Sequence, residues 1–230
     1  MNKTKNYIVF DFETGGVDPR KNAACEIACI IVDGTTLEFK GSYQSLIKPF
    51  SEELTYEPGA IKVTGITKEM CESQGKPIIQ VVDELCEFFL KAVTHKGPKY
   101  LPILVGHNVL FDIGFLSQIF LFCKKDLSKY ISSTKDIYGT PSFSSIDTME
   151  DTARTYGHDL QLLNWKLETI CNFVGIELND AHRAMNDTLS TAELFRFFTR
   201  KMRSSGSKGI DESNSDNSRF RAKFQIKTVS

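Results

Sequence analysis

The pattern of apolar and polar residues predicts a mixed α/β chain that opens with strands. Strands are expected at the apolar runs 7–10, 25–32, 37–47, 101–105 and 143–146. The dipeptide Asp33-Gly34, which is typical of a hairpin turn, joins the second and third runs. The sheet is therefore predicted to open as an antiparallel meander.

Apolar residues at helical spacing predict amphipathic helices between and after these strands. The expected helices cover residues 68–73, 79–93, 109–123, 162–174 and 183–202. Asn108 is expected to cap the third of them. Asp147 is expected to cap a further helix, with Glu150 in a capping box, and the alternative for Asp147 is a role in the site. In the last helix, Asp187 lies off the apolar stripe, which consists of Met185, Leu189, Ala192, Phe195, Phe198 and Met202. Trp165 is interpreted as a core residue.

Composition changes after residue 203 and divides the chain in two. Residues 204–218 are polar and lack core-forming side chains, which is typical of a flexible linker. Residues 220–227 then alternate apolar and mostly basic side chains, a pattern that suits a strand added to a partner, a contact with nucleic acid, or a disordered end. We therefore predict one domain at 1–203 and a linker with a basic and apolar tail at 204–230.

The overall composition is that of an ordinary globular protein. The chain has 230 residues, 41% of them hydrophobic and 25% charged, enough for one core. Its apolar runs are too short to span a bilayer and its start lacks a signal segment, so no membrane contact and a cytoplasmic location are predicted. The six cysteines lie in apolar patterns without a Cys-x-x-Cys pair, which favours buried reduced thiols. A net charge of -1 argues against strong non-specific duplex binding.

Candidate chemistry begins at the end of the first strand. Asp11 and Glu13 are two residues apart, so a strand places both carboxylates on one face, next to the turn at Gly15-Gly16. Two carboxylates this close repel each other unless a cation holds them. Oxygen ligands of this kind suit Mg²⁺ or Mn²⁺. The turn is therefore interpreted as half of a metal site.

Two later segments supply further candidates. Asp112 lies in the first turns of one predicted helix, and Asp187 lies one turn into another. Helix starts and a strand end can converge at one edge of an α/β sheet. Four carboxylates in one cleft suggest two divalent ions, about 4 Å apart in enzymes that hydrolyse phosphodiesters. His182, just before the last helix, is the candidate proton acceptor for the attacking water.

These segments resemble the motifs of the DnaQ-like family of 3'-to-5' exonucleases, in the subgroup with four acids and a catalytic histidine. The first, second and third motifs correspond to residues 11–14, 106–112 and 182–187, and the intermediate segments to 65–67 and 166–170. Each motif alone is weak, but five in the family's order are specific. The chain departs from the family at Gly15, where threonine is common, and at Thr64, where histidine is common.

The resemblance implies a ribonuclease-H-like fold, a central mixed sheet flanked by helices. It implies Asp11, Glu13, Asp112 and Asp187 as ligands of two divalent metals, with Mg²⁺ replaceable by Mn²⁺, and His182 as general base. It also implies that Phe12, Thr14, Thr64 and Asn108 contact the substrate. The expected reaction is the release of nucleoside monophosphates from a 3' end.

Two hypotheses about the substrate stay open, together with a third in which the protein is not an enzyme. The resemblance to proofreading exonucleases of bacterial polymerases favours DNA, with a DNA polymerase or other replication protein bound through the tail at 204–230. An RNA-trimming or oligonucleotide exonuclease is the alternative. A catalytically silent nucleic-acid or polymerase-binding module is the third reading, and a lost ligand would be its usual sign.

Overall fold

A five-stranded mixed sheet forms the centre of the computed structural model, which describes residues 4–159, 161–176 and 183–206. The strands follow the order β3-β2-β1-β4-β7. They are β1 (Tyr7–Thr14), β2 (Ala24–Val32), β3 (Phe39–Leu46), β4 (Ile103–Gly106) and β7 (Ser145–Asp147). β1, β2 and β3 pair antiparallel, whereas β4 pairs parallel with both β1 and β7. The predicted meander is confirmed, although its turn spans residues 33–38 rather than two residues.

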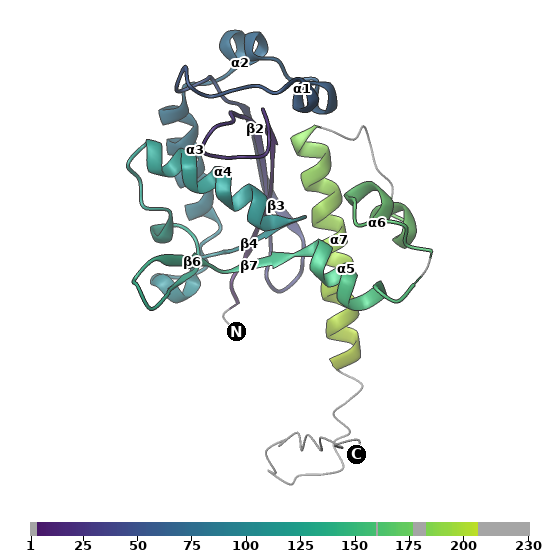
Figure 1. Ribbon diagram of the computed structural model, residues 1–230. Helices are drawn as coiled ribbons and strands as arrows, with labels where there is room; N and C mark the ends of the chain where they lie inside the picture. The colour runs from purple at the N-terminus through teal and green to yellow at the C-terminus, as the bar shows by residue number, and fades with distance from the viewer. Residues whose placement is uncertain (1–3, 160, 177–182, 207–230) are drawn as a thin grey trace, which may run out of the picture.

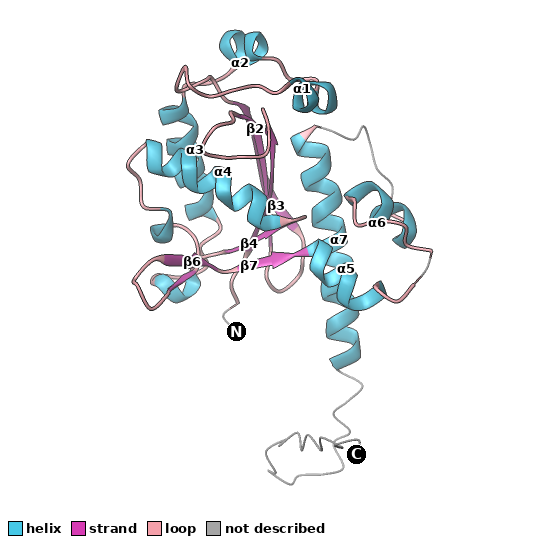
Figure 2. Ribbon diagram, in the orientation of Figure 1, coloured by secondary structure: helices cyan, strands magenta, loops and turns pink. Residues whose placement is uncertain are grey.

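Helices cover both faces of this sheet. They are α1 (Pro58–Thr64), α2 (Lys68–Gln74), α3 (Ile78–Lys91), α4 (Val109–Phe122), α5 (Thr148–Tyr156), α6 (Leu167–Val174) and α7 (Ala184–Gly206). Figure 1 shows α3 and α4 on one side of the sheet and α7 on the other. A small hairpin of β5 (Ser133–Lys135) and β6 (Pro141–Phe143) and two single 3-10 turns, Pro98–Tyr100 and Leu127–Lys129, complete the described elements (Figure 2).

Strand β2 shows why this arrangement is stable. All nine of its residues are buried, because helices pack on both faces of the sheet. Ile27 and Cys29 point into the core formed with α3 and α4. Ile30 points to the opposite side, where it packs with Ala192 and Phe195 of α7. The predicted α/β class, with a central mixed sheet flanked by helices, is confirmed.

The C-terminal half differs from the prediction in which residues it buries. The helix expected from 162 begins only at Leu167, and Trp165 is 39% exposed rather than part of the core. In α7, Leu189 and Met202 are exposed, whereas Thr188 is fully buried. The Thr188 hydroxyl donates to the Ala184 carbonyl at 2.6 Å, so a polar residue is satisfied within the helix and can face the sheet. The predicted stripe is therefore right at Ala192, Phe195 and Phe198, which are buried, and wrong at Leu189 and Met202.

The predicted domain boundary falls inside a helix. α7 continues to Gly206, past residue 203, and the rest of the predicted linker and tail lies outside the described residues. The cysteines are free thiols, all buried except the half-buried Cys123, as predicted. None of the helices in the described part of the chain combines the length and the apolar character needed to cross a membrane.

Candidate active site

Strand β1 presents two acids on one face and an aromatic ring on the other. Asp11 and Glu13 lie toward the carboxyl end of the strand, and Glu13 is buried. Phe12, between them, is 5% exposed and packs with Phe115 at a ring distance of 6.2 Å. The contacts of the Phe12 ring are therefore those of a core residue, and its predicted contact with substrate stays a prediction.

The turn after β1 is packed against a later loop. The Thr14 hydroxyl, predicted to contact substrate, donates to the Gly16 carbonyl at 2.7 Å and so helps to shape the turn. The Gly15 amide donates to the Ala23 carbonyl at 2.8 Å. A Cβ atom at Gly15 would lie only 2.6 Å from the Thr55 carbonyl oxygen. This close approach accounts for glycine where the family often has threonine.

Helix α7 brings a third acid to the same place. Carboxylate oxygens of Asp11, Glu13 and Asp187 all lie within 4.8 Å of one another. Among the described residues, this is the group of acids, histidines and cysteines whose spacing suits a metal ion. The prediction that a strand end and a helix start converge is therefore met by these three residues.

Asp112 adjoins this group from α4 without being part of it. It is 2% exposed, and one of its carboxylate oxygens accepts a hydrogen bond from the Phe12 amide at 3.0 Å. This bond fastens the first turn of α4 to the carboxyl-terminal part of β1. The predicted ligand Asp112 is therefore held beside Asp11 and Glu13 by the backbone of β1.

Burial and mutual repulsion raise the pKa values of the acids in the site. Burial, together with the charges of Asp112 and Glu13, holds the pKa of Asp11 well above its usual value. Burial and the charges of Asp187 and Glu26 raise the pKa of Glu13 to about 7, although Arg183 opposes this. Burial also raises the pKa of Asp112, against the effect of the Phe12 amide. A set of carboxylates with raised pKa values is typical of a functional site, and a bound cation would compensate their charges.

The remaining predicted residues have separate positions. Asn108 is exposed at the start of α4 with a positive φ of 60°, and its side chain does not cap the helix. Thr64 ends α1, where its hydroxyl accepts from the Ile66 amide at 3.1 Å. His182, the predicted base, lies outside the described residues. Substrate contacts of Asn108 and Thr64 stay predictions.

Asp147 caps two helices, its own helix α5 as predicted and also α4, for which Asn108 was the predicted cap. Its carboxylate accepts from Asn108 and Val109 amides, both at 3.0 Å, and from the Met149 amide at 2.9 Å. It therefore caps both α4 and its own helix α5. Glu150 pairs with Arg154 instead of completing a capping box.

Replacing Asp147 with alanine should destabilise two helix starts at once. We expect the free energy of unfolding to fall by about 2 kcal/mol, because loss of one N-cap costs about 1 kcal/mol. Urea unfolding measures this. Asp126→Ala is the control, because Asp126 caps one 3-10 turn through Ser128. Equal losses for the two variants would contradict the double cap.

Sequence reasoning overlooked Glu26, which lies opposite Glu13 in the β1/β2 register and is 2% exposed. Its signal is a single charged residue inside the otherwise apolar β2.

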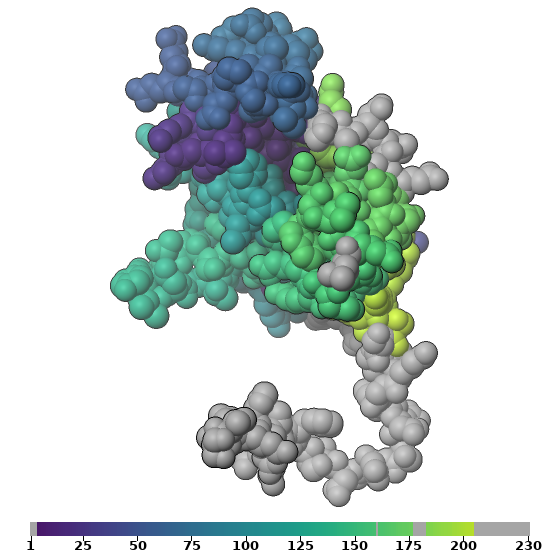
Figure 3. All heavy atoms as spheres, turned by 45° about the vertical axis from the view of Figure 1, so that its right-hand side comes forward, coloured from purple at the N-terminus to yellow at the C-terminus, as the bar shows by residue number. Residues whose placement is uncertain are grey.

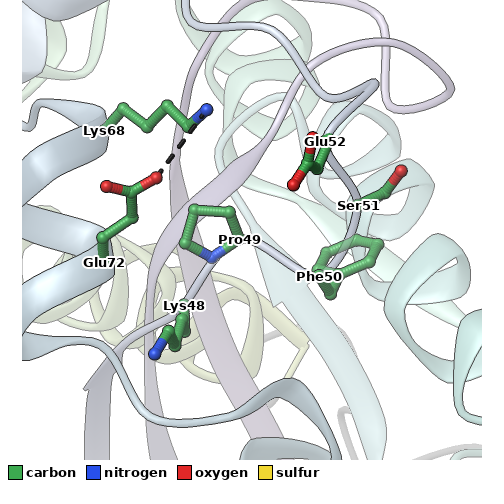
Figure 4. Close-up of a pocket in the computed structure, with 7 residues that line it drawn as sticks. All are labelled: Lys48, Pro49, Phe50, Ser51, Glu52, Lys68 and Glu72. Carbon is green, nitrogen blue, oxygen red and sulfur yellow. Dashed lines mark ion pairs between the residues drawn. The ribbon is translucent and has the colours of Figure 1, made fainter.

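On the face in Figure 3, purple N-terminal atoms adjoin teal atoms from the middle of the chain and green atoms from beyond residue 145. Figure 4 shows a hollow between the loop 48–52 and α2, beside the Lys68–Glu72 ion pair of 3.7 Å. None of the candidate acids lines that hollow.

A mixed five-stranded sheet flanked by helices, with acids at the carboxyl end of its central strand, is the arrangement of the ribonuclease-H-like fold. The exonuclease family RNase_T matches residues 8–195, and the chain belongs to this family. The prediction that the chain is a DnaQ-like nuclease, and therefore a hydrolytic enzyme, is confirmed.

The chain matches most of the length of one kind of curated relative and only a small part of another. Ribonuclease T of Marinobacter nauticus is 31% identical over 196 residues, covering 82% of this chain and 79% of the relative. The PolC-type DNA polymerase III of Clostridium perfringens is 27% identical over 198 residues. The chain spans only 11–13% of the length of the PolC-type relatives.

Solved structures agree with the fold. Exonuclease I of E. coli in complex with a dT13 oligonucleotide superposes with a TM-score of 0.68 at 21% identity, covering 88% of this chain and 43% of that one. At this identity the similarity shows the ribonuclease-H-like fold and not the substrate.

Proposed function

We propose that the protein is a metal-dependent 3'-to-5' exonuclease that releases nucleoside monophosphates from single-stranded or frayed DNA ends. The observation that carries the proposal is the group of Asp11, Glu13 and Asp187 carboxylates within 4.8 Å of one another. Family membership supports hydrolysis of nucleic acid. Similarity to PolC-type DNA polymerases supports DNA.

Each residue of the site has a defined task in this proposal. Asp11, Glu13 and Asp187 would hold divalent cations, and Asp112 would complete the set while its bond to the Phe12 amide fixes α4. Two such ions supply Lewis-acid chemistry to a phosphodiester. His182 would accept the proton of the attacking water. Mg²⁺ is the proposed ion and Mn²⁺ its substitute.

RNA is the second candidate substrate. Ribonuclease T of Marinobacter nauticus shares 31% identity, and the alignment covers 79% of its length, far more than that of any PolC-type relative described above. Discrimination between the two polymers depends on contacts near the 2'-hydroxyl.

A time course on matched 5'-labelled single-stranded DNA and RNA tests both candidates. With Mg²⁺ or Mn²⁺ we expect a ladder that shortens from the 3' end, with DNA degraded at least about tenfold faster, a discrimination of about 1.4 kcal/mol. Chelator should abolish the ladder. Faster shortening of RNA would replace the DNA assignment with the second candidate. Absence of a ladder on either polymer would favour a silent binding module.

A replication partner bound through residues 204–230 stays a prediction, because most of that segment lies outside the described residues.

A further inference from the structure

Glu26 is a buried carboxylate in a place where burial needs a reason. It is 2% exposed within β2 and lies directly across from Glu13 in the strand register. A carboxylate removed from water is costly unless hydrogen bonds and opposite charges compensate it. Its negative charge also adds to the repulsion within a site that is already acidic. The contacts of Glu26 should therefore show what its presence achieves.

These contacts join three elements. One oxygen of Glu26 accepts a hydrogen bond from the Ala184 amide at 3.3 Å. The other accepts from the Gln44 side chain of β3 at 2.9 Å and lies 3.7 Å from a guanidinium nitrogen of Arg183. Ala184 is the first residue of α7. Glu26 thus connects the middle of the sheet to the beginning of the last helix.

The bond to Ala184 uses a donor that the helix itself cannot satisfy. Amides in the first turn of a helix have no partner within the helix, and the positive end of the helix dipole attracts a carboxylate. The Asp187 amide donates to the Arg183 carbonyl at 3.1 Å, so Asp187 lies one turn beyond the point that Glu26 holds. Displacement of this first turn would move Asp187 away from Asp11 and Glu13.

We infer that Glu26 is a positioning residue that holds the first turn of α7 so that Asp187 faces Asp11 and Glu13. The inference rests on the proposed function for its kinetic readout, whereas its metal-binding readout does not. If the bond to the Ala184 amide is what positions α7, the length of the Glu26 side chain should affect Mn²⁺ binding more than its charge does. Glutamine keeps the length and an acceptor oxygen without the charge, whereas aspartate keeps the charge but is one methylene shorter.

The experiment compares Glu26→Asp with Glu26→Gln in the full chain. Calorimetric titration with Mn²⁺ in the absence of nucleic acid measures metal affinity, and 3'-end shortening gives kcat and KM. We expect Glu26→Asp to weaken Mn²⁺ binding and lower kcat about tenfold or more, the usual effect of losing a group that orients a ligand, with little change in KM. Glu26→Gln should lose clearly less than this tenfold in both Mn²⁺ affinity and kcat.

Matched changes at Glu84 control for the loss of a well-bonded carboxylate. Glu84 on α3 is bonded to Tyr43, Lys76 and Gln80, away from the site, and neither Glu84→Asp nor Glu84→Gln should change Mn²⁺ affinity. A loss for Glu26→Gln as large as that for Glu26→Asp would overturn the inference, because charge and not reach would then matter. Unchanged Mn²⁺ affinity in Glu26→Asp would overturn it too. Weakened Mn²⁺ binding in Glu26→Asp, in a protein whose wild type shortens neither polymer, would reject the exonuclease proposal and support the positioning role.

Discussion

Asp11→Asn should remove 3'-end shortening almost completely while making the metal-free protein more stable. We expect kcat to fall by about a thousandfold or more, since loss of a direct ligand should exceed the tenfold to hundredfold cost of losing a group that orients one. The gain in stability follows from the raised pKa of Asp11, whose causes are burial and the charges of its acidic neighbours. Near neutral pH the unfolded chain has this carboxylate ionised, so folding must either bury the charge or take up a proton, and the amide removes that cost.

The two effects of Asp11→Asn need separate measurements. Single-turnover assays at saturating Mg²⁺ measure the loss of activity, and urea unfolding in chelator measures the gain in stability. Glu150→Gln serves as the control, because Glu150 is an exposed carboxylate on α5 paired with Arg154. Activity of Asp11→Asn near the wild-type level at saturating Mg²⁺ would contradict the assignment of Asp11 as a ligand.

The sequence was sufficient for the sheet and for the acids on it. Strand period places Asp11 and Glu13 on one face, and their convergence with Asp187 follows from the order of motifs in the family that the chain resembles. Asp112 was predicted from its place in a helix start, and its 3.0 Å bond to the Phe12 amide agrees with that place.

Other features depend on contacts that periodicity does not encode. Helix α1 contains no buried residue, so it has no apolar stripe to detect. Thr188 faces the sheet because its hydroxyl is satisfied inside α7, and hydropathy scores such a residue as polar. Glu26 shows the same limit, since its partner Ala184 lies 158 residues away in the sequence. Long-range satisfaction of polar groups decides these positions.

Stability of the metal-free protein should fall as the pH rises through the titration of Glu13. The folded-state pKa of about 7 lies above the ordinary value of 4.5, so the folded protein binds the proton more tightly than the unfolded chain. This contribution is fully present below 4.5 and is lost as the pH rises to 7. Glu13 alone should account for a decrease of about 3 kcal/mol, and burial of Asp11 and Asp112 acts in the same direction.

Divalent metal should reverse this trend, because a carboxylate must lose its proton to act as a ligand. We expect Mn²⁺ to raise the urea midpoint little near pH 5 and most above pH 7, where Glu13 is ionised. Unfolding curves of the wild type and Glu13→Gln, with chelator and with Mn²⁺, isolate the contribution of this residue by difference. A difference between the two proteins that stays constant from about pH 5 to about pH 8 in chelator would show that Glu13 does not titrate there. Equal Mn²⁺ stabilisation of both proteins would show that Glu13 is not a ligand.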